Sequence, residues 1–149
     1  MNLTNEFQTI RQWAYSRGIY ESGDMKTQQV KLQEEVGETS RAILTNNRDE
    51  LIDAIGDCVI VLTNLARLAE QHFCDQCATC RGLGGDFANE NGEGVWVECK
   101  DCGTLDIETC INKAYKEIKD RTGEMCNGTF IKTNIKTIKI STNENKENI

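Results

Sequence analysis

The sequence contains no proline and only one histidine among its 149 residues. Without proline, no ring clash or missing N–H group interrupts a helix, and turns depend on glycine and asparagine. The near absence of histidine leaves carboxylates and cysteines as the main side chains available to bind metal ions. The composition therefore favours long helices and restricts the chemistry of any metal site.

The chain also lacks an excess of positive charge and any long apolar run. Its 17 Lys and Arg residues against 24 Asp and Glu residues give a formal net charge of −7, which argues against binding nucleic acid or an anionic membrane. A polyanionic substrate would need a metal ion or a local basic cluster. No stretch approaches the ~20 apolar residues of a membrane span, and the N-terminus lacks a signal peptide pattern. We expect a cytoplasmic protein.

Helical periodicity predicts an all-α fold. A chain of this length fits one compact domain, or one domain with a small insert. Helices are expected around residues 7–14, 26–44, 49–71 and 105–121. The third is the clearest, because its apolar residues recur at i, i+4, i+7, i+11, i+14 and i+18. These residues are Leu51, Ile55, Cys58, Leu62, Leu65 and Ala69.

Carboxylates form a strip on each of the two middle helices. Glu34, Glu35 and Glu38 follow one another on the second helix, and Glu50, Asp53 and Asp57 on the third. A solvated acidic face is the simpler interpretation, but an apolar run at 58–62 follows Asp57 and indicates a helix surrounded by protein. Buried carboxylates at close range repel by roughly 4 kcal/mol per pair at an effective dielectric of 20. Such a cluster favours Mg²⁺ and phosphate chemistry.

The same stretches resemble the MazG-like all-α nucleoside triphosphate pyrophosphohydrolases. The family pattern is Glu-Glu-x-x-Glu, found here at 34–38, followed by Glu-x-x-Asp, found at 50–53 and leading into Ile-Gly-Asp57. Similarity extends to residues 10–14 and 114–121. The resemblance covers the chain outside its cysteine-rich segment and its tail.

The resemblance implies a set of magnesium ligands and catalytic residues. Glu35 and Glu38 would bind Mg²⁺, with Glu34 as an outer ligand or base. On the third helix, two alignments with the family pattern are possible. Alignment on the apolar run that follows Asp57 favours Asp53 and Asp57 as ligands and places the family glutamate at Ala54. The literal Glu-x-x-Asp motif adds Glu50 as a ligand.

The resemblance also implies residues that contact the triphosphate. Lys113, Lys119 and Arg121 would contact phosphates, although interleaved acids equally suit a solvated surface. Lys31 begins the motif and is a further candidate. Trp13 could stack on a base or belong to the core. A family asparagine is replaced here by Tyr115.

The reaction implied by this resemblance is the Mg²⁺-dependent hydrolysis of an NTP or dNTP to the monophosphate and pyrophosphate. Relatives assemble as dimers or tetramers, so we expect a homo-oligomer. The alternative is an inactive scaffold that serves as a zinc-containing binding or regulatory module, consistent with Ala54 and Tyr115.

Two Cys-x-x-Cys pairs, Cys77 with Cys80 and Cys99 with Cys102, lie 18 residues apart with glycines after each pair. This spacing is typical of a zinc ribbon with a structural Zn²⁺; Cys74 or His72 could replace one ligand. We therefore expect a zinc module at 74–103, inserted between the third and fourth helices of a helical domain at 1–73 and 104–129. Residues 130–149 would form a short hairpin near 130–140 and a flexible tail.

Overall fold

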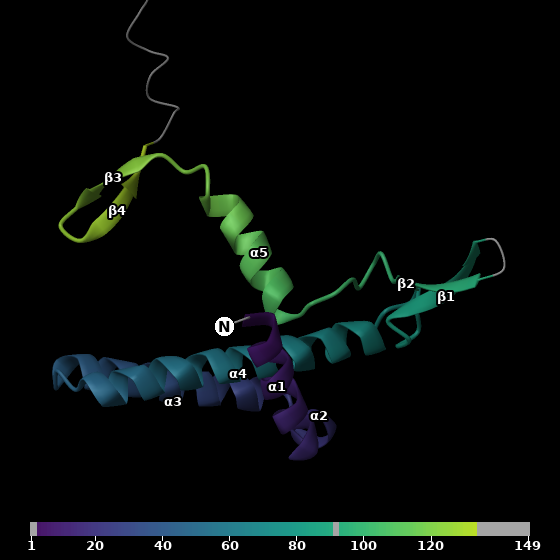
Figure 1. Cartoon of the computed structure of the whole chain (residues 1–149), viewed down its shortest axis with the longest axis horizontal. Coiled ribbons are helices and arrows are strands. Elements are labelled where there is room, and N and C mark those ends of the chain that lie inside the picture. Colours follow the sequence, from purple (N-terminus) through teal and green to yellow (C-terminus); the bar gives the residue numbers. More distant parts are fainter. Residues whose placement is uncertain (1–2, 91–92, 134–149) are drawn as a thin grey trace, which may run out of the picture. The chain divides into compact units, whose positions relative to one another are not determined.

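A computed structural model describes residues 3–90 and 93–133 of the chain. It is mostly helical, as predicted, and divides into two compact units, residues 1–112 and 113–149. The first unit holds the long helices and the cysteine-rich segment. The second holds the end of the last helix and a small hairpin (Figure 1).

The first unit begins with three helices. These are α1, Leu3–Ser16, α2, Ile19–Ser22, and α3, Met25–Leu44. Gly18 separates the first two with a left-handed φ of 71°, a conformation that costs glycine little. Asp24 caps α3, because its carboxylate accepts the N–H groups of Lys26 and Thr27 at 2.7 and 3.0 Å, which helix formation leaves without partners.

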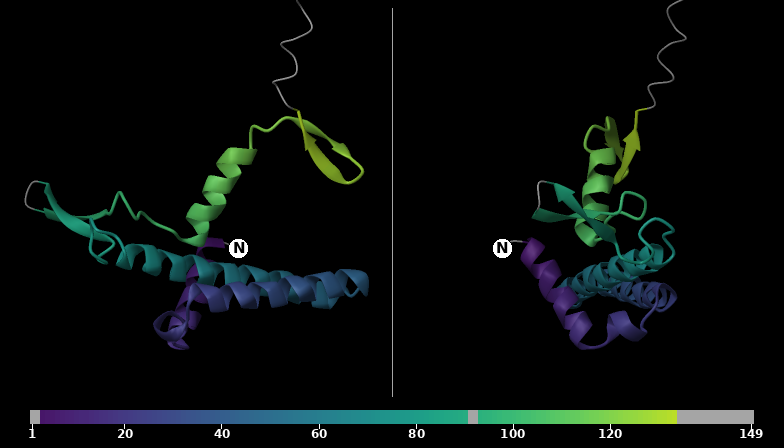
Figure 2. Two further views of the ribbon diagram at one scale, coloured as in Figure 1. Left: turned by 180° about the vertical axis from the view of Figure 1, so that it is seen from behind. Right: turned by 90° about the vertical axis from the view of Figure 1, so that its right-hand side faces the viewer.

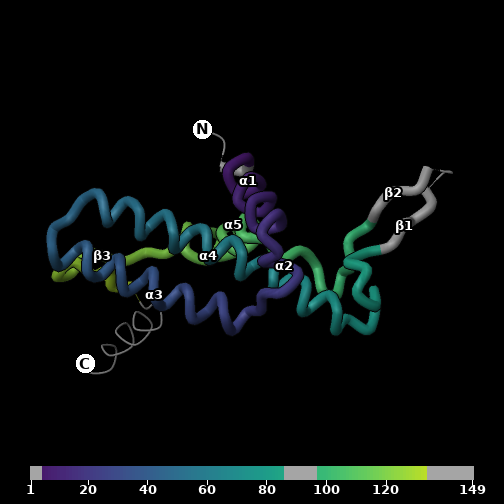
Figure 3. The backbone as a smooth tube through the Cα atoms, turned by 90° about the horizontal axis from the view of Figure 1, so that it is seen from below, coloured from purple at the N-terminus to yellow at the C-terminus, as the bar shows by residue number. Residues whose placement is uncertain are grey.

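Helix α4, Arg48–Asp75, runs antiparallel to α3 (Figure 3). The turn between them contains Asn46 with a φ of 51° and Asn47, whose side chain accepts the Glu50 N–H at 3.3 Å. The asparagines thus end one helix and cap the next, as the sequence predicts. With 28 residues, α4 extends about 42 Å at 1.5 Å per residue.

The core of the first unit is small. Phe7 from α1, Ala66 from α4 and Ile107 are buried together, and Ile10 and Leu105 pack against them. Figure 2 shows α1 crossing the pair formed by α3 and α4. Elsewhere the helices approach through alanines, of which Ala14, Ala42 and Ala54 are almost fully buried.

Among the described residues, α4 keeps part of its apolar surface exposed. Of the stripe predicted from the sequence, Ile55 and Leu62 are exposed, whereas Leu51, Cys58, Leu65 and Ala69 are partly buried. Ile52, Ile55, Val59 and Leu62 are 56, 52, 39 and 38 % exposed, whereas Ala54, Val61 and Leu68 are buried. The expectation that the helix around Asp57 is surrounded by protein is therefore wrong for the single chain. The physical reason is that α1, α2 and α3 cover only one side of α4.

The cysteine-rich segment follows α4 directly. It contains an antiparallel hairpin of β1, Gly85–Glu90, and β2, Glu93–Glu98, in which Gly85 pairs with Glu98. The strand-like run at 95–97 lies in β2. The segment leads into α5, Ile107–Ile118, which begins within the first unit.

A second hairpin, in the second unit, joins β3, Gly123–Cys126, to β4, Thr129–Lys132. Asn127 and Gly128 form its turn with φ of 48° and 78°, as expected of an Asn-Gly hairpin. The hairpin expected near 130–140 thus begins earlier, within the segment assigned to the helical domain. Residues 134–140 lie outside the described residues.

Candidate functional site

Helices α3 and α4 bring four acidic residues into one neighbourhood. Glu35 and Glu38 lie on α3, and Asp53 and Asp57 lie on α4. Glu35 is almost fully buried, with 3 % of the residue exposed, and Asp57 is half-buried, whereas Glu38 and Asp53 are exposed. We call these four residues the acidic seam.

The pKa of Asp57 reflects this crowding. Burial raises it above its ordinary value, and the charges of Glu35, Asp53 and Glu38 raise it further. Negative charges that disfavour one another in this way favour a bound cation. The carboxylates whose charges raise the pKa of Asp57 most are Glu35 on α3 and Asp53 on α4.

Lys31 lies over the buried end of the seam. Its ammonium group is 2.6 Å from Glu35 Oε1 and 3.1 Å from Glu34 Oε2, and the bond to Glu35 is the largest cause of its raised pKa. Arg41 pairs with Glu38 at 3.6 Å. Within the described ranges, no three carboxylates have oxygens that converge as metal ligands would. Two of the four seam residues, Glu35 and Glu38, pair with Lys31 and Arg41 instead.

A cavity of about 690 Å³ lies against the seam. Glu35, Asp57, Lys31 and Trp13 are among the residues that line it. The Trp13 residue is 48 % exposed, with the Arg17 guanidinium 6.0 Å from its ring centre, so it is not a core residue. The cavity therefore joins an aromatic ring to an anionic centre.

The predicted phosphate contacts of the last helix lie in the second unit. Lys113 is in α5, and Lys119 and Arg121 follow its end. All three are exposed, and Lys119 lies 3.8 Å from Asp120. The acidic seam and its cavity are formed without them.

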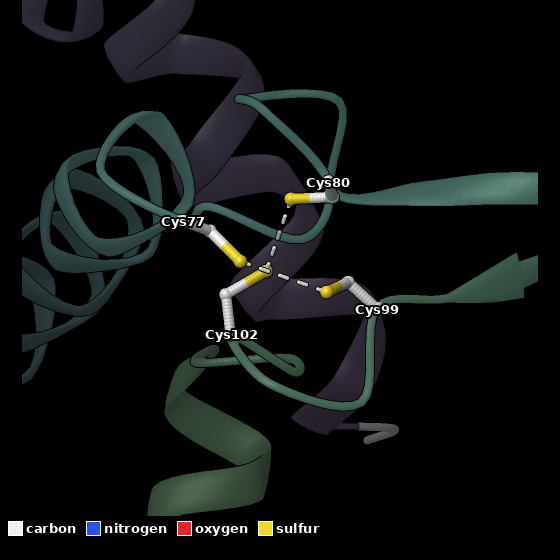
Figure 4. Close-up of side chains that lie close together, drawn as sticks. All are labelled: Cys77, Cys80, Cys99 and Cys102. Carbon is white, nitrogen blue, oxygen red and sulfur yellow. Dashed lines mark hydrogen bonds between the residues drawn. The ribbon is translucent and has the colours of Figure 1, made fainter.

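Four cysteines converge at the start and end of the β1–β2 hairpin (Figure 4). The sulfur atoms of Cys77, Cys80, Cys99 and Cys102 all lie within 4.8 Å of one another. Cys77 Sγ is 3.7 Å from Cys99 Sγ, and Cys80 Sγ is 3.5 Å from Cys102 Sγ. This quartet is the one predicted from spacing, and four thiolates at such distances suit a tetrahedral Zn²⁺ site.

Backbone N–H groups support the quartet. Burial alone raises the pKa of the Cys80 thiol, but the N–H groups of Gly84 and Gly82, together with neighbouring thiols, lower it to about 6. The N–H groups of Cys102 and Asp101 lower the pKa of Cys99. Gly82 and Gly84 both have positive φ, which lets the backbone turn its N–H groups towards sulfur. The donor set therefore fits a metal that binds thiolates.

The two substitute ligands considered from sequence lie outside the quartet. Cys74, at the end of α4, has its sulfur 3.9 Å from Cys80 Sγ but is not one of the four that converge. His72 interacts instead with Gln76 at 3.1 Å. The position of Cys74 makes it a neighbour of the site.

Sequence reasoning missed one polar residue in the cavity. Asn64 lies on α4 with 3 % of the residue exposed, and its side chain accepts a hydrogen bond from the Tyr20 hydroxyl at 2.8 Å. An asparagine within the apolar run of a helix was the available signal. Its partner lies 44 residues away in the sequence, so the pair emerges only from the fold.

Comparisons with known proteins agree with this part of the fold. Residues 24–75 match the MazG nucleotide pyrophosphohydrolase domain, and they include α3, α4 and the whole acidic seam. The chain is also similar to an uncharacterized 18.2 kDa protein from the rep-hol intergenic region of Haemophilus phage HP1 (strain HP1c1). The two are 36 % identical over 66 residues, which cover 44 % of this chain and 40 % of that protein. No solved structure matches the chain. In the described residues, no helix is long and apolar enough to cross a membrane.

Proposed function

We propose that the protein is a Mg²⁺-dependent nucleoside triphosphate pyrophosphohydrolase, which cleaves an NTP or dNTP to the monophosphate and pyrophosphate. The observation that carries this proposal is the half-buried Asp57, surrounded by Glu35, Asp53 and Glu38, at the wall of a cavity large enough for a nucleotide. The match of residues 24–75 to the MazG domain supports it.

The seam supplies the groups that this reaction needs. Glu35, Glu38, Asp53 and Asp57 would hold Mg²⁺, which neutralises phosphate charge and activates water when bound. Glu34 is exposed beside the seam and would accept the proton of the attacking water. Glu50 lies one turn before Asp53 and would at most be a peripheral ligand of the Mg²⁺.

Lys31 has two roles in this proposal. Without metal or substrate, its ammonium balances Glu35 and Glu34. When cations and phosphates enter, Lys31 can leave Glu35 and contact a phosphate oxygen, because its flexible stem permits a short movement. Lys113, Lys119 and Arg121 remain proposed phosphate contacts.

The direct test is turnover of a panel of NTPs and dNTPs by purified, zinc-loaded protein with Mg²⁺. Pyrophosphate release is expected from at least one member. Glu38→Gln and Asp57→Asn should each abolish release while leaving helicity unchanged, and Glu50→Gln should be milder. No turnover across the panel would overturn the proposal, and equal losses in the three variants would show that the ligands are assigned to the wrong register.

A second candidate function is a binding or regulatory module without catalysis. It is favoured by the arrangement of the carboxylates, whose oxygens do not converge within the described residues although the four thiols do. Ala54 is buried at the position where the alignment on the apolar continuation expects a glutamate, and this also favours a module without catalysis. Binding of nucleotide without pyrophosphate release would support this candidate.

We also propose that Cys77, Cys80, Cys99 and Cys102 hold a structural Zn²⁺. The segment is built on a single two-stranded hairpin. Because an isolated hairpin is marginally stable, metal binding would contribute folding energy.

A homo-oligomer is the remaining proposal. The exposed apolar residues of α4 recur at spacings of 3, 4 and 3 and form one face, and Val36 and Ile43 of α3 are also exposed. A second copy would cover this surface by presenting the same helices, as a two-fold dimer does.

A further inference from the structure

The hydrogen bond between Tyr20 and Asn64 fixes the orientation of a buried amide. The Tyr20 hydroxyl donates to Asn64 Oδ1 from α2, and Tyr20 itself does not line the cavity beside the seam. Burial is the largest cause of the raised pKa of Tyr20, so the hydroxyl keeps its proton at neutral pH and acts as a donor. The Oδ1 atom of Asn64 is therefore already hydrogen-bonded by a residue that does not line the cavity.

The NH₂ group of Asn64 is the polar group left for a ligand. Among residues 3–90 and 93–133, the hydrogen bond that the side chain makes is the one from Tyr20. The Asn64 side-chain nitrogen is not among the fully enclosed polar atoms that lack a partner, so it is open to the cavity that the residue lines with Ile60, Val61 and Ile19. Asn64 therefore presents donors to whatever enters the cavity.

The cavity orients a nucleotide by its two ends. Phosphates belong at the anionic end, where Glu35 and Asp57 can hold Mg²⁺ and Lys31 supplies positive charge. Trp13, half exposed, offers a ring face for a base. The edge of the base remote from the sugar would then face Asn64.

We propose that Asn64 reads the base of the triphosphate and selects a keto oxygen on that remote edge, with Tyr20 as its positioning residue. This inference rests on the proposed function. The preferred substrates would be 4-oxopyrimidine and 6-oxopurine nucleotides, because their oxygen accepts from the NH₂ group. An amino group in the same place is itself a donor, so the amino group of the base and the NH₂ group of Asn64 both lack an acceptor.

Gln28 also lines the cavity, but within the described part of the chain no hydrogen bond fixes its side-chain amide. It can turn either its oxygen or its nitrogen to the ligand. Asn64, by contrast, is held by the Tyr20 hydroxyl with Oδ1 as the acceptor, so it is the better placed of the two amides to discriminate between keto and amino groups.

Two matched pairs of substrates test the inference. UTP and CTP differ in the group at position 4, and ITP and ATP differ at position 6. With Mg²⁺, kcat/KM is expected to be about tenfold or more higher for the keto member of each pair. Asn64→Leu should abolish the preference by slowing UTP and ITP. Thr63→Val is the control, because Thr63 is buried next to Asn64, bonds Val59 O at 2.8 Å and does not line the cavity.

Tyr20→Phe separates positioning from folding and remains informative if Asn64→Leu does not fold. Loss of the hydroxyl frees the amide to turn, so the keto preference should fall several-fold, through KM for UTP more than through kcat. A purely structural role for Tyr20 would lower kcat/KM equally for all four substrates and would contradict its assignment.

The outcomes distinguish this inference from the proposed function. Turnover with no keto preference, or a preference that survives in Asn64→Leu, overturns the inference and leaves the pyrophosphohydrolase intact. If no triphosphate is turned over, calorimetric binding of the same four nucleotides with Ca²⁺ decides: a keto preference lost in Asn64→Leu supports the role of Asn64, and its absence overturns that role too.

Discussion

At the scale of single residues, Asp57 lies where ionisation of its carboxylate costs some stability. Burial and the charges of Glu35 and Asp53 raise its pKa, so the folded protein binds a proton there more tightly than the unfolded chain. Stability then falls as the pH rises from the unfolded pKa near 3.8 through the raised folded pKa. At neutral pH the ionised Asp57 destabilises the metal-free protein.

Asp57→Asn should therefore raise the melting temperature of the Mg²⁺-free protein while it removes activity. We expect a gain below about 1 kcal/mol, because solvent screens part of the repulsion. Mg²⁺ should raise the Tm of the wild type and leave that of the variant unchanged, since ligand binding stabilises only a form that binds. Asp49→Asn is the control, because Asp49 is exposed on the same helix. A lower Tm for Asp57→Asn would contradict the repulsion.

At the scale of elements, the ion pair of Arg11 and Glu108 ties α1 to the start of α5. Both guanidinium nitrogens contact the Glu108 carboxylate, at 2.9 and 3.0 Å, and both side chains are 23 % exposed. The Arg11 hydrogen bond holds the pKa of Glu108 below its ordinary value of 4.5. The stability that this pair contributes is present above pH 4.5 and is lost as the pH falls through the lower, folded pKa.

Glu108→Gln should destabilise the protein by about 1 kcal/mol at pH 7. It should also flatten the dependence of stability on pH below about 5, because the lowered pKa is gone. Urea unfolding between pH 3 and 7 measures both effects. Glu6→Gln, an exposed change on α1, should alter neither; an equal effect there would point to overall charge instead of the ion pair.

The cysteine-rich segment gives the second prediction at this scale. One zinc per chain is expected by elemental analysis, and Cys80→Ser should lose it, because Cys80 is a buried member of the converging quartet. Cys74→Ser should keep the zinc, since its sulfur lies beside the quartet without joining it. Loss of zinc from both variants, or from neither, would show that the ligands are wrongly chosen.

The sequence predicted the elements of this protein better than their contacts. The expected helices at 26–44 and 49–71 agree closely with α3 and α4, because 3.6-residue periodicity and the Asn46–Asn47 turn are local signals. The cluster of four thiols follows from spacing in the same way. The second hairpin begins before the residues where the sequence predicts it. Residues after 130 are rich in β-branched side chains and favour strands there, whereas the turn lies at Asn127–Gly128.

The contacts that were missed depend on tertiary structure. Glu35 is buried and Glu34 exposed although they are neighbours on one helix, and only the position of α4 decides between them. The bond from Tyr20 to Asn64 joins residues far apart in sequence. The carboxylates of the acidic seam could thus be named from their spacing, but the burial of Glu35 and the partners of each side chain could not.

At the scale of the whole molecule, one apolar face of α4 lies on the surface of the described chain, and it includes Ile55 and Leu62 of the predicted core stripe. Ile52, Ile55, Val59 and Leu62 have the spacing of a buried helix face but are more than a third exposed in one chain. Apolar patches of this kind on a protein surface mark interaction sites. A second copy that packs α3 and α4 against the same helices would bury the stripe and reconcile the pattern with the fold.

Sedimentation of the purified protein tests this assembly. A 16.8 kDa chain should sediment as a dimer or tetramer at micromolar concentration. Ile52→Asp combined with Ile55→Asp should yield monomers, because charges placed in an apolar interface are costly to bury. Leu83→Asp, a change of an exposed apolar residue in the cysteine-rich segment, should leave the mass unchanged. Dissociation by Leu83→Asp alone would place the contact between copies elsewhere, and a monomeric wild type would show that there is no such contact. In either case the exposed stripe would require a different partner.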